Sequence, residues 1–239
     1  MKELFYFEWI IFDNCNLNCS YCVTKGEFSH KEMEKISYVP GREIDIAHRI
    51  VELSHLTNKV VVNLTGGEPL LAYRIKEVIS ILKTASNIHV NLISNFSLVD
   101  KIADVLSDLD SILVSLHIRH RSPADMENLI NSINYAKNKS SLSLCQVDYG
   151  LNADDKKILS HVSSKTEMDI RLQPFIPRWN EKGRIEKSRQ LSDKTFISSF
   201  GKRCSLGYLA FLLGPDGNIY HGLWCNPKSQ KIGNMLAPL

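Results

Sequence analysis

Six short β-rich runs alternate with longer amphipathic stretches between residues 6 and 173 of this chain. The runs lie at residues 6–12, 59–64, 89–94, 111–117, 141–149 and 168–173. Parallel strands need a long crossover between them, usually a helix, whereas hairpin strands are joined by short turns. The alternation therefore predicts an α/β fold built from parallel βα units.

The stretches between the runs have the spacing of helices that bury one face. They lie at residues 45–56, 70–84, 98–109, 123–137 and 154–162. In the second of them Ile75, Val78 and Leu82 recur at helical spacing. Ser122 followed by Pro123 predicts an N-cap and the first helical residue. Right-handed βα units form either a partial barrel or a doubly wound sheet, and both place functional loops at the carboxyl ends of the strands.

The pattern changes beyond residue 176. The charged, proline-containing stretch that follows residue 176 is typical of a linker, and a short helix is expected near residues 192–200. Residues 208–213 and 218–220 flank the sequence Gly214-Pro215-Asp216-Gly217, which predicts a hairpin turn. We therefore expect a main domain at residues 1–176 and a short α+β extension at residues 177–239.

The composition argues against several classes of protein. A chain of 239 residues with 44% hydrophobic content can bury a full core, and a net charge of +3 gives no electrostatic footprint for nucleic acid. The apolar stretch at residues 4–12 contains Glu8 and is too short to span a bilayer. Six cysteines, three of them crowded together, fit a reducing compartment better than a disulfide scaffold. We expect a soluble cytoplasmic protein that binds neither membrane nor nucleic acid.

Cys15, Cys19 and Cys22 follow the first predicted strand within one short loop. Thiolates are the ligands that iron-sulfur and zinc centres select, and three of them can hold three irons of a 4Fe-4S cluster and leave the fourth iron open. The alternative is a structural zinc site, which needs four ligands. No fourth ligand is supplied locally, because the nearest histidine, His30, lies eight residues beyond Cys22.

The run Cys-Asn-Leu-Asn-Cys-Ser-Tyr-Cys resembles the CxxxCxxC signature of the radical S-adenosylmethionine (SAM) enzymes. The resemblance implies a partial (βα)6 TIM-like barrel and a 4Fe-4S cluster at Cys15, Cys19 and Cys22, whose open iron is chelated by SAM. It also implies that Tyr21 lies near the adenine. In this family an electron from the cluster cleaves SAM, and a 5'-deoxyadenosyl radical then abstracts a hydrogen from the substrate. A reductant such as flavodoxin or ferredoxin is implied as a partner.

A second motif, Gly66-Gly67-Glu68-Pro69, follows the second predicted strand. Two glycines let the backbone approach a ligand closely, and Glu68 can accept hydrogen bonds from an ammonium group. Alone the motif is a common turn, but together with the cysteine run it resembles the family's GGE motif, which is expected to hold the SAM amino group. By the same resemblance, Asn95 and Ser115 match polar positions that contact the ribose or methionyl part of SAM.

Strand parity assigns further side chains to the inside of the fold. In residues 111–117 the aliphatic side chains share one face, so Ser115 and His117 are expected on the other. The same parity places Arg171 and Gln173 inward, where a guanidinium could meet a carboxylate. His117, Arg171 and Gln173 are therefore candidate substrate or SAM contacts. The alternatives are a structural salt bridge for Arg171 and a solvated basic loop for residues 119–121.

The three cysteines outside the run have separate interpretations. Cys145 lies in the fifth strand, where a lone cysteine is usually a small buried hydrophobe; a hydrogen donor to a substrate radical is the competing hypothesis. Cys204 and Cys225 resemble parts of a SPASM or twitch extension, which binds auxiliary iron-sulfur clusters. Gly222 stands where that pattern expects a cysteine, so a complete extension is impossible. A second cluster at Cys204 and Cys225, with a ligand such as His221, competes with a cluster-free extension, which we favour because two thiolates rarely hold a cubane.

We predict an enzyme that acts on a peptide or on a small natural-product or sugar-like substrate. Only 14 residues precede the cysteine run, which favours a compact substrate or a short peptide. One alternative is an RNA-modifying enzyme of the same family, for which the chain has no room for an added RNA-binding domain. The other is a non-catalytic iron-sulfur protein for electron transfer or sensing, which would have no use for the Gly66-Gly67-Glu68 motif.

Overall fold

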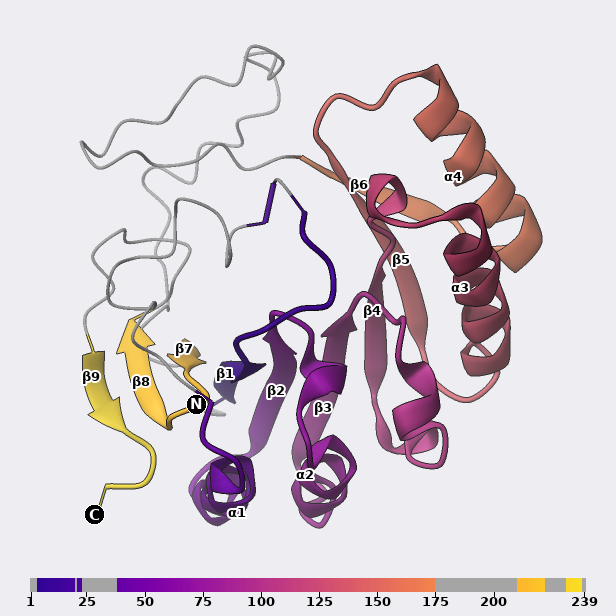
Figure 1. Cartoon of the computed structure of the whole chain (residues 1–239). Coiled ribbons are helices and arrows are strands. Elements are labelled where there is room, and N and C mark those ends of the chain that lie inside the picture. The colour runs from indigo at the N-terminus through magenta and orange to yellow at the C-terminus, as the bar shows by residue number, and fades with distance from the viewer. Residues whose placement is uncertain (1–3, 20, 23–37, 175–209, 222–230, 238–239) are drawn as a thin grey trace, which may run out of the picture.

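The described part of the chain forms one nine-stranded sheet (Figure 1). The computed structural model describes residues 4–19, 21–22, 38–174, 210–221 and 231–237. Along the sheet the strands stand in the order β6-β5-β4-β3-β2-β1-β7-β8-β9. Their bounds are β1 Leu4–Phe12, β2 Lys59–Gly66, β3 Ile88–Ser94, β4 Ser111–Ser115, β5 Leu142–Asp148, β6 Ile170–Pro174, β7 Ala210–Leu213, β8 Asn218–His221 and β9 Lys231–Asn234.

The first six strands pair in parallel, each with the next strand in the sequence. The α-helices between them are α1 Arg42–Ser54, α2 Ile75–Leu82, α3 Pro123–Ala136 and α4 Ala153–Thr166. These helices line one face of the sheet (Figure 1), and no helix of the described residues is long and apolar enough to cross a membrane. The predicted α/β fold of parallel βα units is confirmed, and the carboxyl ends of its strands meet at one edge.

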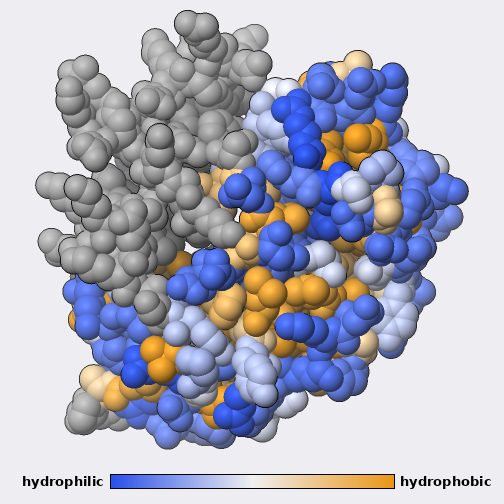
Figure 2. Space-filling model, viewed as in Figure 1, coloured by the Kyte–Doolittle hydropathy of each residue, from blue (hydrophilic) through white to orange (hydrophobic). Residues whose placement is uncertain are grey.

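The helix-covered face of the sheet forms the apolar core. Trp9 and Ile11 of β1 are fully buried there, and the predicted stripe of α2, which includes Ile75, Val78 and Leu82, is buried as well. Apolar burial contributes about 25 cal/mol for each Å² removed from water, so this face dominates the stability. Most of the described surface in Figure 2 is hydrophilic. The face opposite the helices, here called the inner face, carries polar side chains on several strands.

The segment at residues 98–109 is not the single α-helix that its apolar spacing predicts. It forms two 3-10 helices, Val99–Ile102 and Leu106–Asp108. Its buried residues are Val99, Ile102, Leu106 and Leu109. Two of the three intervals between them are three residues long, which suits 3-10 turns, because side chains three residues apart lie above one another there.

Helix starts follow their local capping chemistry. Ser122 caps α3 as predicted: its hydroxyl accepts from the backbone N of the third helical residue at 3.2 Å, and Pro123 is the first helical residue. The helix predicted at residues 70–84 begins instead as a 3-10 turn, Pro69–Leu71. The α-helix α2 therefore starts later and ends earlier than its sequence pattern indicates.

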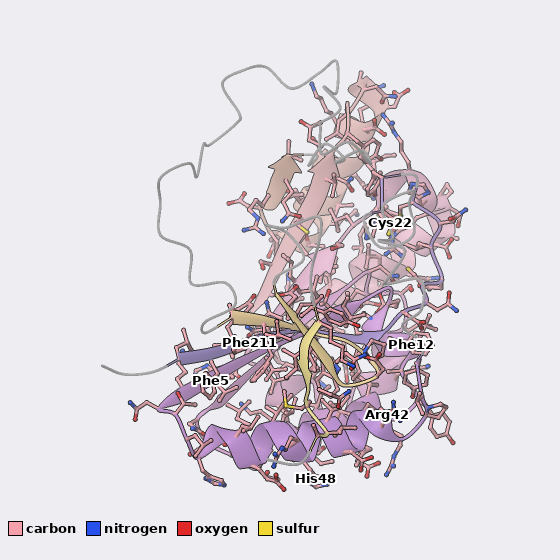
Figure 3. The ribbon with its side chains drawn as sticks, turned by 90° about the vertical axis from the view of Figure 1, so that its left-hand side faces the viewer. Phe5, Phe12, Cys22, Arg42, His48 and Phe211 are labelled. Atoms are coloured by element: carbon pink, nitrogen blue, oxygen red, sulfur yellow. The ribbon has the colours of Figure 1, made fainter. Side chains whose placement is uncertain are left out.

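The C-terminal hairpin extends the same sheet. Strand β7, which carries Phe211 (Figure 3), pairs with β1 in parallel. The ring of Phe211 stacks on that of Phe7 with centroids 5.8 Å apart. Strands β7 and β8 form the predicted antiparallel hairpin, and β9 pairs with β8. Arg42 at the start of α1 donates to the carbonyl of Asp216 in the hairpin turn at 3.4 Å. The helix predicted near residues 192–200 lies outside the described residues.

Asp155 joins the start of α4 to the loop after β4. Its carboxylate accepts from the backbone N of Asn152 at 2.8 Å and from Arg119 Nε at 3.1 Å. We expect Asp155→Ala to lower the free energy of unfolding by about 1–2 kcal/mol. Asp154→Ala, at the exposed neighbouring position, should change it by less than about 0.5 kcal/mol. Chemical denaturation at neutral pH measures both differences.

The effect of Asp155 depends on pH. The hydrogen bonds from Arg119 hold the pKa of this carboxyl below its usual value. Its stabilisation is therefore present above the unfolded-state pKa and is lost as the pH falls through the lower folded-state pKa. The difference between wild type and Asp155→Ala should shrink in acid, and an undiminished difference in strong acid would contradict the ion-pair account.

Candidate functional site

The loop after β1 holds three cysteines at the carboxyl edge of the sheet. Cys15, Cys19 and Cys22 are half-buried. The backbone N of Leu17 donates to Cys15 Sγ at 3.3 Å, and Cys22 N donates to the carbonyl of Cys19 at 3.1 Å. Burial raises the pKa of Cys19 to about 11, and the nearby Cys22 and Cys15 act in the same direction. The three sulfur atoms therefore lie within electrostatic reach of one another.

The Gly66-Gly67 turn at the end of β2 is joined to this loop by backbone hydrogen bonds. Gly67 N donates to Phe12 O and Glu68 N donates to Asn14 O, both at 2.8 Å. A Cβ at Gly66 would lie 2.2 Å from Phe12 O, and one at Gly67 would lie 2.2 Å from Asn14 O. Gly66 also has a φ of 138°, which L side chains rarely adopt. The two glycines therefore allow the backbone before the cysteines to pack closely against the turn.

The Glu68 carboxylate is fully buried and binds groups beside it. It accepts from Leu70 N at 3.0 Å, from Ser94 Oγ at 2.7 Å and from Asn95 N at 2.8 Å. Burial raises the pKa of Glu68, and these hydrogen bonds act in the opposite direction. The side chain ties the end of β2 to the end of β3, and its contact with the SAM amino group stays a prediction.

Asn95 connects the end of β3 to the cysteine loop. Its Nδ2 donates to Asn16 Oδ1 at 2.8 Å and lies 3.8 Å from Cys15 Sγ. Its Oδ1 accepts from Ser97 N at 3.0 Å, and Asn16 donates to Ser97 Oγ at 2.7 Å. Sequence reasoning finds Asn95 but misses Asn16 and Ser97. Their closeness in sequence to predicted site residues is the signal that could have found them.

Tyr21 lies in a stack of aromatic rings. Its ring centroid is 4.4 Å from that of Tyr149 and 5.9 Å from that of His117. Its hydroxyl is 2.8 Å from His117 Nδ1, which also lies 3.5 Å from Cys19 Sγ. Burial lowers the pKa of His117 to about 4, and the nearby Arg121 acts in the same direction. The ring is therefore neutral at neutral pH, and Nδ1 can accept the Tyr21 hydrogen.

His117 does not continue the strand as its parity predicts. Strand β4 ends at Ser115, and His117 has a left-handed backbone with a φ of 49°. This conformation turns the ring toward Tyr21 and Cys19, as the contacts above show. The expected strand at residues 111–117 is therefore two residues too long.

The two arginines after β4 bind other parts of the protein, although Arg119 stays exposed to solvent. Arg121 Nε donates at 2.7 Å to a backbone carbonyl just beyond β4, and another of its nitrogens donates to the carbonyl of Asn95. Arg119 forms an ion pair with Asp155, and its guanidinium lies 4.5 Å from the centre of the Tyr149 ring. Sequence reasoning misses Tyr149, although a position at the end of the fifth predicted strand is a signal for site residues.

The strand register brings other candidate residues together on the inner face. Ser115, Cys145 and Arg171 stand opposite one another on β4, β5 and β6. Ser115 Oγ lies 3.6 Å from Cys145 Sγ, and Gln173 stands opposite Val147. Cys145 is only 2% exposed, and burial raises its pKa. Within the described ranges no carboxylate forms an ion pair with Arg171.

The chemistry of the donor set suits a polynuclear cluster. In the part of the chain that the structure describes, no three His, Cys, Asp or Glu side chains are placed to hold a single metal ion. Three thiols on one loop are nevertheless soft donors for three irons, which spread over more space than one ion. Cys204, Cys225 and the side chain of His221 lie outside the described residues.

The match to a family model establishes the family. Residues 9–162, which are 154 of the 239 residues, match the model described as the Radical SAM superfamily. The chain belongs to the radical SAM superfamily. The matched segment runs from β1 into α4 and contains the cysteine loop, the Gly66-Gly67-Glu68 motif and Asn95.

Several curated proteins resemble this radical SAM protein. A probable GTP 3',8-cyclase of Methanocaldococcus jannaschii is 29% identical in an alignment of 135 residues that covers 53% of this chain and 43% of that protein. The GTP 3',8-cyclase of Synechocystis sp. is 27% identical in an alignment of 201 residues that covers 78% of this chain and 57% of that protein. A 7-carboxy-7-deazaguanine synthase of Clostridium acetobutylicum is 36% identical over 91 residues, 37% of each protein. The matches thus span less than two thirds of each relative's length, and the family and these names indicate an enzyme.

Solved structures share the fold. Native anSMEcpe with bound AdoMet superposes with a TM-score of 0.67 at 14% identity, over 97% of this chain and 78% of that chain. SuiB of Streptococcus suis bound to S-adenosylmethionine superposes with a TM-score of 0.59 at 13% identity, over 96% of this chain and 61% of that chain. At this identity the likeness shows the fold alone, and it confirms the predicted partial barrel.

Gly67→Ala tests whether the turn supports the cysteine loop. The added Cβ would lie 2.2 Å from Asn14 O, so the loop must shift. We expect the free energy of unfolding to fall by about 1–3 kcal/mol, and less iron to be retained after anaerobic reconstitution. Gly233→Ala is the matched control, since among the described residues only Ile219 Cδ1, at 3.9 Å, would lie near its Cβ. Equal stability and equal iron content in both variants would contradict this role.

Proposed function

We propose that this radical SAM protein reductively cleaves SAM at a 4Fe-4S cluster and abstracts hydrogen from a small-molecule or short-peptide substrate. The observation that carries the proposal is the attachment of the cysteine loop to the Gly66-Gly67 turn by two backbone hydrogen bonds. A loop fixed in this way offers three thiolates and leaves one iron of a cubane without a ligand from this loop. SAM could bind at that iron.

The residues of the chain position the reacting groups. When bound, the cluster supplies the electron that breaks the sulfonium bond of SAM. Cys15, Cys19 and Cys22 would ligate three irons, and Asn95 Nδ2, 3.8 Å from Cys15 Sγ, would orient that sulfur. Such hydrogen bonds to ligating sulfur tune the reduction potential of a cluster.

SAM would lie between the motifs at the strand ends. Backbone carbonyls of Gly66 and Gly67 would meet its amino group. The Glu68 carboxylate, which is fully buried, would join them once SAM binding makes it accessible. Asn95 and Ser115 would contact its ribose or methionyl part. Tyr21, held by its stack with Tyr149, would pack near the adenine. The solved neighbours that contain bound SAM support SAM as the ligand.

The relatives support a compact substrate. The curated proteins that match are named for GTP and for 7-carboxy-7-deazaguanine, which are small molecules. His117, Arg171 and Gln173 are the candidate contacts for this substrate or for SAM. Cys145, which faces inward beside Ser115, is the candidate hydrogen donor to a substrate radical. A reductant such as flavodoxin or ferredoxin would deliver the electron.

Two other functions would give different results in the same assay. A non-catalytic iron-sulfur protein for electron transfer or sensing would hold a cluster without cleaving SAM. An RNA-modifying enzyme of the superfamily would cleave SAM and act on RNA, for which the net charge of +3 offers no electrostatic footprint. The names of the curated relatives favour the small-molecule enzyme over both.

SAM cleavage is the decisive assay. After anaerobic reconstitution and reduction with dithionite, we expect wild type to convert SAM to 5'-deoxyadenosine. Cys19→Ala should lose both the cluster and the cleavage, whereas Cys145→Ala should keep its iron. The ratio of product to 5'-deoxyadenosine in Cys145→Ala then tests the donor role of that thiol. An intact cluster in wild type without any 5'-deoxyadenosine would contradict the proposed function.

Iron content tests the interpretation of the C-terminal extension. We propose that residues 177–239 form a reduced SPASM/twitch-like extension without a cluster. Reconstituted protein should then contain about four irons per chain, the stoichiometry of one cubane. A value near eight would show a second cubane and would assign Cys204 and Cys225 to it.

A further inference from the structure

Four neighbouring strands carry polar side chains at matching positions of the inner face. Glu8 of β1 stands opposite Asn63 of β2, Asn63 opposite Asn91 of β3, and Asn91 opposite Ser111 of β4. Each of these residues is half-buried. Tyr6, two residues before Glu8, reaches the same place through its hydroxyl. These five residues are here called the polar row.

Every hydrogen bond of the polar row leads toward Glu8. Ser111 Oγ donates to Asn91 Oδ1 at 2.8 Å, and Asn91 Nδ2 donates to Asn63 Oδ1 at 2.9 Å. Asn63 Nδ2 donates to Glu8 Oε2 at 3.1 Å and also to the Tyr6 hydroxyl, which in turn donates to the same Glu8 oxygen at 3.0 Å. The amide orientations follow from this chain of donors and acceptors. The row is therefore polarised, with the carboxylate at its accepting end.

Glu8 has capacity left for a ligand. Both hydrogen bonds that the described residues give it go to Oε2, so Oε1 has no partner among them. None of the described lysines, arginines and histidines forms an ion pair with Glu8. Burial raises the pKa of this carboxyl, as expected for a charge that lacks a counter-charge. A bound cation would supply that counter-charge.

The polar row lies deeper on the inner face than the predicted SAM contacts. Ser111 and Ser115 are on the same side of β4, four residues apart, which is about 13 Å along a strand. The inner-face positions between these levels include the apolar Ile10, Ile93 and Leu113 and the polar Thr65 and Ser143. A substrate that reaches both levels would therefore be elongated.

We propose that the polar row is a substrate subsite that binds a cationic nitrogen group, such as an amidinium, a guanidinium or an ammonium, through Glu8. The inference rests on the proposed function, because a substrate held at the polar row must extend from there to the SAM site. Packing alone does not require polar side chains, because apolar side chains of similar volume are often equally stabilising in a protein interior. Polarised donors that converge on one carboxylate instead suit the binding of a charged group.

The subsite is tested with a cationic probe and its neutral counterpart. Benzamidine and benzamide have the same ring and similar shape, but only benzamidine carries an amidinium. Titration of reconstituted wild type in the presence of SAM should show saturable benzamidine binding, at least about tenfold tighter than benzamide binding. Glu8→Gln, which keeps the acceptor oxygen but removes the charge, should abolish this preference, and Glu8→Asp should keep part of it.

Glu127→Gln is the matched control. Glu127 is exposed and interacts with His161 on the outer helices, so the preference for benzamidine should be unchanged. Equal benzamidine affinity in wild type and Glu8→Gln, or no saturable binding to wild type, would overturn the subsite.

If Glu8→Gln does not fold, proton NMR decides: contacts between bound benzamidine and the Tyr6 ring support the subsite, and their absence overturns it. SAM cleavage by wild type is measured separately, so its failure would overturn the proposed function without touching the binding result.

Discussion

The contact between the Gly66-Gly67 turn and the cysteine loop is the constraint on which the site depends. Two backbone hydrogen bonds of 2.8 Å join the segments. A Cβ at Gly66 would lie 2.2 Å from the carbonyl oxygen of Phe12, the last residue of β1, and one at Gly67 would lie 2.2 Å from that of Asn14 in the loop. The end of β2 therefore fixes where the loop after β1 can run. The Gly66-Gly67 motif therefore positions the cysteine loop, in addition to any contact that it makes with a ligand.

Further contacts make the strand ends one connected unit. Glu68 binds the end of β3 through Ser94 and Asn95, and Asn95 holds the loop through Asn16. Arg121 binds the carbonyl of Asn95 from the segment after β4. Each of these polar groups is stabilised by the hydrogen bond to its neighbour, because a buried polar group without a partner costs free energy. A site built in this way holds its geometry on rigid strands, which suits radical chemistry that must exclude water.

Sequence patterns predicted the parallel strands, because the alternation of strands and crossovers is local information. They did not predict that β7 pairs with β1, since periodicity does not say which strands become neighbours. The segment at residues 98–109 was predicted as one helix because its apolar spacing fits both helix types. The motifs located Cys15, Glu68 and Asn95, but the polar row was missed. Residues 8, 63, 91 and 111 align only when the strand register is known.

The central claim is that the cysteine loop holds a cluster with one iron open to SAM. Electron paramagnetic resonance of the reconstituted, reduced protein tests it most directly, with spectra recorded before and after SAM is added. Binding of SAM at an open iron changes the ligand field of the cluster and should shift its signal. A cluster signal that is identical with and without saturating SAM would contradict the account.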